Sequence, residues 1–158
     1  MFSLPLIAET QFALYISGSL SGQYQQSTPD GLVTGSYAVS PAFTISPYTL
    51  PAVFVKAGKF KSIDPFTHIF EGELMVSIMS QIDDDQNVMV THDSIVQQVY
   101  SILSDADAIK AGVNAANFEL WGIVPTEYDH ELVQKEKSRE LATVLGFTIN
   151  CQNLGVSV

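Results

Sequence analysis

The sequence predicts an α+β fold, with a mixed, mainly antiparallel β-sheet of about four strands flanked by two or three helices. Between Phe70 and Leu103 the apolar residues change from a two-residue spacing, typical of a strand, to the spacing of one helix face. Several other predicted strands follow one another directly, which favours antiparallel pairing over βαβ units. With 158 residues the chain can bury one core, so we expect residues 1–158 to form a single domain.

The first predicted element is a helix over residues 5–20, with Pro5 in its first turn, where a missing amide proton is tolerated. Apolar residues nearly encircle this segment, so we expect it to be deeply buried or to pack on another subunit. A strand over residues 11–16 is the alternative interpretation.

Residues 17–50 are predicted to form an extended arm or a protruding hairpin that becomes ordered in an assembly. The segment is rich in Gly, Ser, Thr and Pro, as in Thr28-Pro29-Asp30-Gly31, which indicates turns. It is also too apolar for a free linker, and a structureless loop of this length would be unusual. An edge hairpin packed on its own domain is the alternative.

The central prediction is a strand over residues 70–82 with two different faces. One face is apolar, whereas the other starts with Glu71 and Glu73 and carries Met75 and Met79, as expected for contact with another molecule. A helix follows to Leu103, with Thr91 or Asp93 as its N-cap. The other expected elements are a strand over 50–56, a short helix or loop over 105–116, a strand over 118–124 ended by Pro125, a solvated loop or ribbon over 126–140 and a last strand over 141–151.

The charge balance limits the partners of this chain. Seventeen acidic residues against seven basic ones give a net charge of −10, which disfavours binding to phosphates and to anionic membranes. We therefore expect DNA only to pass along the protein without being bound. No apolar run approaches the roughly 20 residues of a membrane span, and the N-terminus lacks the positive region of a signal peptide. The single cysteine, Cys151, excludes an internal disulfide, fits a reducing compartment and is expected to be buried.

No motif predicts a cofactor, a metal site or catalysis. The acidic turn at residues 83–87 begins like a calcium loop, but Val88 and Ser94 stand where that loop needs glycine and glutamate. The three histidines and the cysteine have no zinc spacing. His92 and Asp93 resemble a general-base pair, but no nucleophile motif accompanies them. We therefore expect the protein not to be an enzyme.

Charged residues are the candidate contacts with other subunits or partners. Arg139 is the only arginine, and its planar guanidinium suits a cross-subunit ion pair with Glu71, Glu73 or the turn at residues 83–85. A merely solvated charge run is the alternative. The complete set of expected interface residues is Glu71, Glu73, Lys56, Lys59, Lys61, Lys135, Lys137 and Arg139.

In its order of elements the chain resembles the tail terminator proteins of long-tailed bacteriophages. The resemblance rests on the N-terminal helix, the irregular arm, a strand ending in Ala57-Gly58, the long strand before Asp83–Asp85, a helix from Asp93, a strand around Trp121-Gly122 and a last strand after Lys137-Ser138-Arg139. It implies a virion protein that forms a ring, typically a homohexamer, at the head-proximal end of the tail after assembly in the host cytoplasm.

By this resemblance the ring caps the tail tube, ends tail polymerisation and joins the tail to the head or neck. Its expected partners are the tube protein, a neck or head-completion protein and, as a further candidate, a sheath protein. A neck or head-closure adaptor and a tube subunit are alternatives within the same class. A monomeric binding module is an alternative outside it, and a hydrolase built on His92 and Asp93 has the least support.

Overall fold

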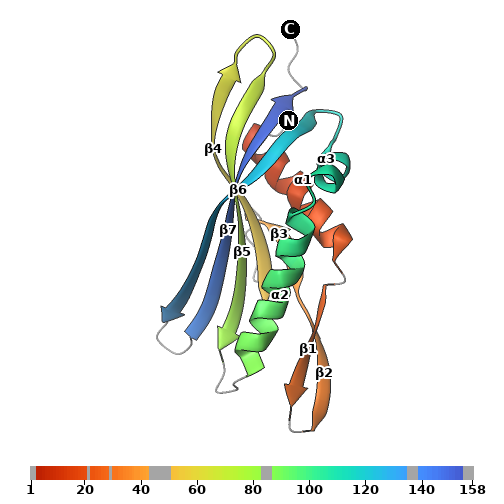
Figure 1. Cartoon of the computed structure of the whole chain (residues 1–158), viewed down its shortest axis with the longest axis vertical. Helices are drawn as coiled ribbons and strands as arrows, with labels where there is room; N and C mark the ends of the chain where they lie inside the picture. The colour runs from red at the N-terminus through yellow and green to blue at the C-terminus, as the bar shows by residue number, and fades with distance from the viewer. Residues whose placement is uncertain are drawn as a thin grey trace.

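The computed structural model describes residues 3–20, 22–28, 30–42, 51–82, 87–134 and 139–154. Along this part of the chain, one helix is followed by five strands, then by two helices and two further strands (Figure 1). Their bounds are α1 (Leu4–Ser19), β1 (Gln23–Thr28), β2 (Gly31–Ser36), β3 (Ala38–Pro41), β4 (Ala52–Asp64), β5 (Ile69–Ile82), α2 (Asn87–Leu103), α3 (Ala106–Val113), β6 (Phe118–Gln134) and β7 (Arg139–Asn153).

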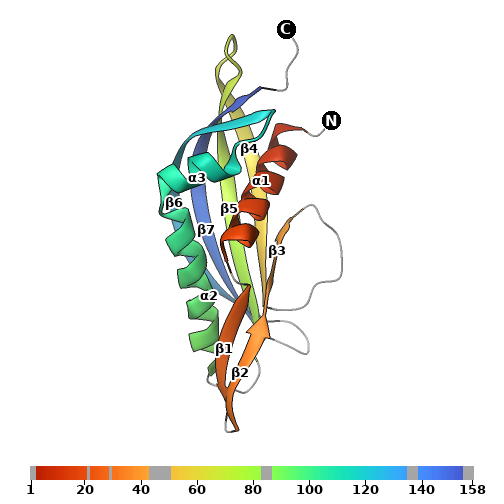
Figure 2. The same cartoon turned by 90° about the vertical axis from the view of Figure 1, so that its right-hand side faces the viewer.

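The main sheet has five strands in the order β3-β4-β5-β7-β6. The short β3 pairs with β4 in parallel, and every other neighbouring pair is antiparallel. The helices α1, α2 and α3 lie on one side of this sheet, and β1 and β2 form a separate hairpin that projects from one end (Figures 1 and 2). The predicted α+β fold is therefore confirmed, with five strands in the main sheet instead of about four.

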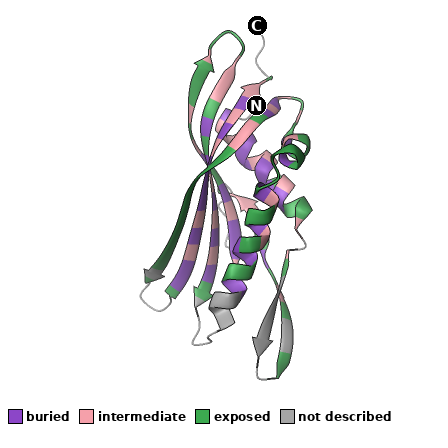
Figure 3. Ribbon diagram, in the orientation of Figure 1, coloured by how far each residue is buried: buried purple, intermediate pink, exposed green. Residues whose placement is uncertain are grey.

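The core lies between the helices and the inward face of β4, β5 and β7 (Figure 3). On β5 the alternate residues Leu74, Val76 and Ile78 are completely buried, which confirms the predicted apolar face of this strand. On β7, Phe147 opposite Leu74 and Leu145 opposite Val76 are also buried, as is Ile149 on the same face. The helices supply the second layer through residues such as Phe12 and Ile16 of α1, Val99 of α2 and Ile109 of α3.

The buried carboxylate of Glu9 gives β4 a hydrogen-bond partner beyond the end of the short neighbouring strand β3. β3 pairs with β4 only as far as Val55, whose carbonyl oxygen accepts a bond from the Ala42 amide. Two residues further on, the Ala57 amide donates to Glu9 Oε1 of α1 at 2.9 Å. Glu9 is only 5% exposed, so this bond gives a partner to an edge amide that β3 does not reach.

Of the extended arm or protruding hairpin expected over residues 17–50, the long arm is not confirmed, whereas a projecting hairpin is present within the segment (Figure 1). Its first residues complete α1, its centre is the β1–β2 hairpin, and Ala38–Pro41 is the edge strand β3 of the main sheet. The hairpin is held at its base, where the Tyr37 hydroxyl donates to Gln98 Oε1 of α2 at 2.9 Å. Residues 43–50 lie outside the described part of the chain.

Two predicted boundaries are wrong. β6 does not end at Pro125 but continues to Gln134, because an edge strand needs no amide proton at that position and a bulge between Pro125 and Glu127 absorbs the irregularity. α2 begins at Asn87, before Thr91 and Asp93, so neither residue is its N-cap. Thr91 is instead buried on the helix face that packs against the sheet.

The packing of α1 predicts a contrast between two of its residues. Phe12→Ala should lower the free energy of unfolding by about 3–5 kcal/mol, because a completely buried aromatic ring is lost from the core. Leu14→Ala, at a residue that is 62% exposed on the same helix, should change it by less than about 0.5 kcal/mol. Urea denaturation of both variants measures the difference, and equal effects would contradict this account of the core.

Candidate interaction surfaces

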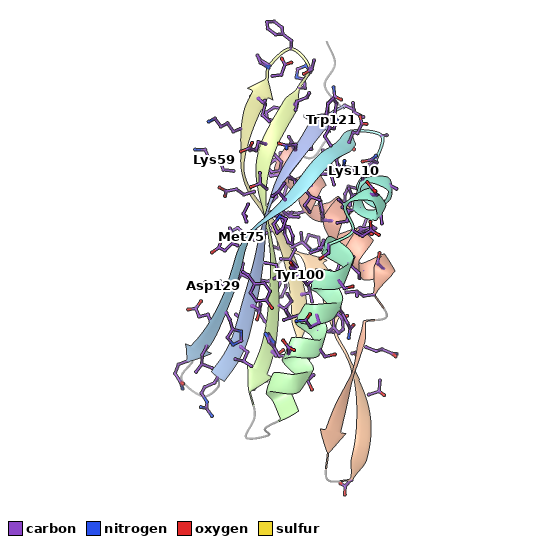
Figure 4. The ribbon with its side chains drawn as sticks, viewed as in Figure 1. Lys59, Met75, Tyr100, Lys110, Trp121 and Asp129 are labelled. Carbon is purple, nitrogen blue, oxygen red and sulfur yellow. The ribbon has the colours of Figure 1, made fainter. Side chains whose placement is uncertain are left out.

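The outward face of the main sheet carries no covering layer among the described elements (Figures 1 and 2). Lys59, Met75 and Asp129 point to this side, away from the helices (Figure 4). An antiparallel sheet with one wet face normally alternates apolar and polar residues, with the polar ones outward. Here the outward positions include half-buried apolar side chains, namely Phe54, Met75, Met79, Ala142 and Val144. We call these five residues the open face.

Charges of opposite sign border the open face. The register places Lys56 of β4 beside Met75, Met75 beside Gly146, and Gly146 beside Glu127 of β6. Lys59 and Lys61 continue the basic border on β4, whereas Asp129 and Glu131 continue the acidic border on β6. All of these charged side chains are exposed. The open face therefore has lysines along β4 and carboxylates along β6, and Glu71 and Glu73 of β5 add exposed carboxylates beside the lysines.

The expected interface residues are only partly brought together. Lys61 lies directly opposite Glu71 in the β4–β5 register, and the Glu73 carboxylate lies against Gly58 in the same hairpin. Arg139 pairs with Ile82 at the other end of β5, far from Glu71, so the two cannot meet within one chain. Lys135, Lys137 and the turn at residues 83–85 lie outside the described residues.

The turn between β4 and β5 presents an apolar tip. Phe66 is 91% exposed and Ile63 is 54% exposed, an unusual position for two large apolar side chains. The tip has a defined backbone, because the Phe66 amide donates to Asp64 Oδ1 at 3.0 Å and the Asn153 amide donates to the His68 carbonyl at 3.0 Å. Sequence reasoning missed this feature, although Asp64-Pro65 is a turn signal next to Phe66.

A groove lies between α2 and β6. It holds about 250 Å³ and is lined by Tyr100, Pro125, Thr126, Glu127, Tyr128, Leu145 and Phe147. The rings of Tyr100 and Tyr128 meet edge to face, with centroids 6.1 Å apart. The groove forms because α2 packs mainly on β5 and β7, and α3 covers only the first part of β6, where Phe118 and Leu120 are buried. The later part of β6 is more open, so Tyr128 is 56% exposed.

Four polar side chains connect α2 with the sheet below it. Ser80 Oγ lies 2.7 Å from His92 Nδ1, and Thr143 Oγ1 lies 2.8 Å from His92 Nε2. Thr143 Oγ1 also lies 3.0 Å from Nδ1 of the exposed His130. Ser80, His92 and Thr143 are all buried, and both nitrogens of the imidazole have partners.

The surroundings of His92 favour its neutral form. The pKa of His92 is lowered from 6.5 to about 4, mainly by burial and in addition by the charge of His130, whereas Asp93 acts in the opposite direction. Asp93 itself is exposed, whereas His92 is buried and lies against Ser80 and Thr143. Cys151 is buried, as predicted, and burial raises the pKa of its thiol to about 12.

Within the described residues, no three His, Cys, Asp or Glu side chains gather so that they could hold a metal ion. None of the described helices has the length and apolarity that crossing a membrane requires. No family model matches the sequence, and no curated protein matches it either. The function therefore has to be inferred from the open face, the hairpin tip and the groove.

His92 predicts a specific dependence of stability on pH. Its pKa is lower in the folded chain than in the unfolded one, so its contribution to stability is complete above pH 6.5 and is lost as the pH falls toward 4. A difference of this size corresponds to about 3 kcal/mol. Urea denaturation at pH 7 and pH 4 should show this loss in the wild type and not in His92→Gln.

The matched control is His68→Asn, at a half-buried histidine outside this group of side chains. It should keep the pH dependence of the wild type, because asparagine tolerates the positive φ of 56° at this position. Equal pH dependence in the wild type and in His92→Gln would contradict the role given to His92.

Proposed function

We propose that this chain is a structural virion protein of a long-tailed bacteriophage, a tail terminator whose copies form a ring, with six as the expected number. The ring caps the tail tube, ends its polymerisation and joins the tail to the head or neck. The open face carries this proposal, because it leaves apolar surface on a folded domain for a partner to cover.

The composition of the open face suits contact with another protein better than contact with water. Met75 and Met79 are flexible side chains that fit the uneven surface of a partner. Charged borders around an apolar centre orient such a partner and add little to its affinity. The tube protein and a neck or head-completion protein are the partners to which we assign this face, with a sheath protein as a further candidate.

The charge of the chain suits a passage for DNA. With a net charge of −10, the ring would repel the phosphate backbone and let DNA pass without binding it. Glu127, Asp129 and Glu131 are exposed along one strand and could contribute to such a wall.

The three buried polar side chains Ser80, His92 and Thr143 favour a structural role over a hydrolytic one. A nucleophile and its base must reach the substrate, whereas Ser80, His92 and Thr143 are enclosed between α2 and the sheet. Their hydrogen bonds join a helix to two strands, so they stabilise the fold.

The test of the proposal is the assembly of the purified full chain. Sedimentation velocity and negative-stain imaging should show a closed ring of about six times the 17.2 kDa chain. The ring should also bind the ends of isolated tail tubes. A chain that stays monomeric at high concentration and leaves tube ends bare would overturn the proposal, and growth into filaments would identify a tube subunit instead.

A substitution on the open face tests its assignment to the tube or neck. Met75→Glu should keep the melting temperature within a few degrees of the wild type, because this side chain is only half-buried, and should weaken binding to tube ends by about 10-fold or more. Gln97→Glu places the same new charge on the exposed side of α2 and should bind normally. Equal binding by the two variants would exclude the open face as the contact.

A further inference from the structure

The hairpin tip and the groove are complementary in chemistry. The tip presents one aromatic side chain that is 91% exposed, held by hydrogen bonds on both sides of the turn. The floor of the groove consists of the core residues Leu145 and Phe147, and its walls include Tyr100 and Tyr128. An aromatic ring can contact Tyr100 or Tyr128 edge to face, which favours such pairs beyond simple burial.

The size of the groove fits a single side chain. Its volume of about 250 Å³ is below the roughly 300 Å³ at which small-molecule sites usually begin. It still exceeds the roughly 150 Å³ of an apolar cavity that can hold benzene. One phenyl ring therefore fits with room for adjustment.

The tip cannot reach the groove of its own chain. Phe147, on the groove floor, pairs with Leu74 of β5, and Phe66 lies eight residues before Leu74. At the rise of a β-strand this separation is about 26 Å. The hydrogen bonds at the base of the tip, including the one from Gln152 Nε2 to the Thr67 carbonyl at 2.7 Å, keep the hairpin extended. Contact between tip and groove therefore requires a second molecule.

The presence of both surfaces on one chain favours a second copy as the partner of the tip. The hairpin that carries the tip has exposed charges of both signs, Lys59 and Lys61 on β4 and Glu71 and Glu73 on β5. Glu127 lines the groove, whereas Asp129 points to the outward side of the sheet (Figure 4). An ion pair between one of the lysines and Glu127 would orient the contact and add little to its affinity.

Direct strand pairing along β6 is a weaker alternative for the same edge. Pro125 has no amide proton to donate, and bulges flank it at Leu120/Gly122 and Pro125/Glu127. Such features normally prevent one sheet edge from adding to another. Side-chain insertion into the groove does not require a regular edge.

We propose that Phe66 of one copy inserts into the α2–β6 groove of the next copy and that this contact joins neighbouring subunits. Tip and groove are different surfaces, so the contact is heterologous, and repeating it yields a closed ring or an open filament. Only the closure of the ring rests on the proposed terminator function.

Two single variants of the full chain test the contact. Phe66→Ser removes the inserted side chain, and Tyr128→Ser removes a wall of the groove at a residue that is exposed. Each should weaken self-association by about 10- to 100-fold in sedimentation equilibrium, as expected for an aromatic residue central to an interface. Leu14→Ser, an exposed apolar position on α1, should associate like the wild type.

Mixing the two variants distinguishes this contact from others. Phe66→Ser retains an intact groove and Tyr128→Ser retains an intact tip, so an equimolar mixture should form heterodimers but no larger species. The double variant should associate no more weakly than the weaker single variant, because both changes remove the same contact. A mixture that stays monomeric, or rings that persist in Phe66→Ser, would overturn the tip-and-groove contact.

The outcomes separate this inference from the proposed function. Closed rings that persist in Phe66→Ser overturn the inference and leave the terminator proposal standing. Open filaments that Phe66→Ser dissolves support the inference and overturn the terminator. A wild type that remains monomeric at high concentration and on tail tubes overturns both.

Discussion

The central β5–β7 pair is covered by helices on one face only, and most other features of the molecule depend on this asymmetry. Its inward side chains belong to the core, and α1 and α2 complete that core from one side. The same ladder sends Met75, Met79 and Val144 to the opposite side, because successive residues of a strand alternate. Burying one face in this way leaves the other available to a partner.

Polar groups join the helix layer to the sheet at two separate points. At one end of the interface, Glu9 of α1 accepts from the Ala57 amide. At another, His92 of α2 lies between Ser80 of β5 and Thr143 of β7. Buried polar groups without partners are costly, so each of these contacts favours one position of its helix on the sheet. The helices are thus positioned by specific bonds as well as by apolar packing.

The surfaces that we assign to assembly follow from the lengths of the elements. β4 and β5 extend beyond α1 and β3, so their turn projects and Phe66 is 91% exposed among the described residues. On the other edge, α2 packs mainly on β5 and β7, and the later part of β6 is left partly open, which creates the groove. A chain with a projecting tip at one site and a recess at another can bind further copies of itself head to tail.

The sequence by itself determined the features that depend on local periodicity. These are the α+β class, the helix at residues 5–20, the alternation of the strand at residues 70–82 and the buried Cys151. Side-chain direction in a helix or a strand follows from backbone geometry alone, so spacing along the chain is enough to predict it.

Only the tertiary structure decided the features that join distant parts of the chain. It placed Ala38–Pro41 in the sheet, carried β6 through Pro125, set Tyr100 beside Tyr128 and connected His92 with Thr143. Pro125 marks a strand end by local rules, yet it is tolerated because β6 is an edge. Whether a strand is at an edge, and whether Phe66 is covered, depends on which segments pack together, and spacing along the chain does not contain that information.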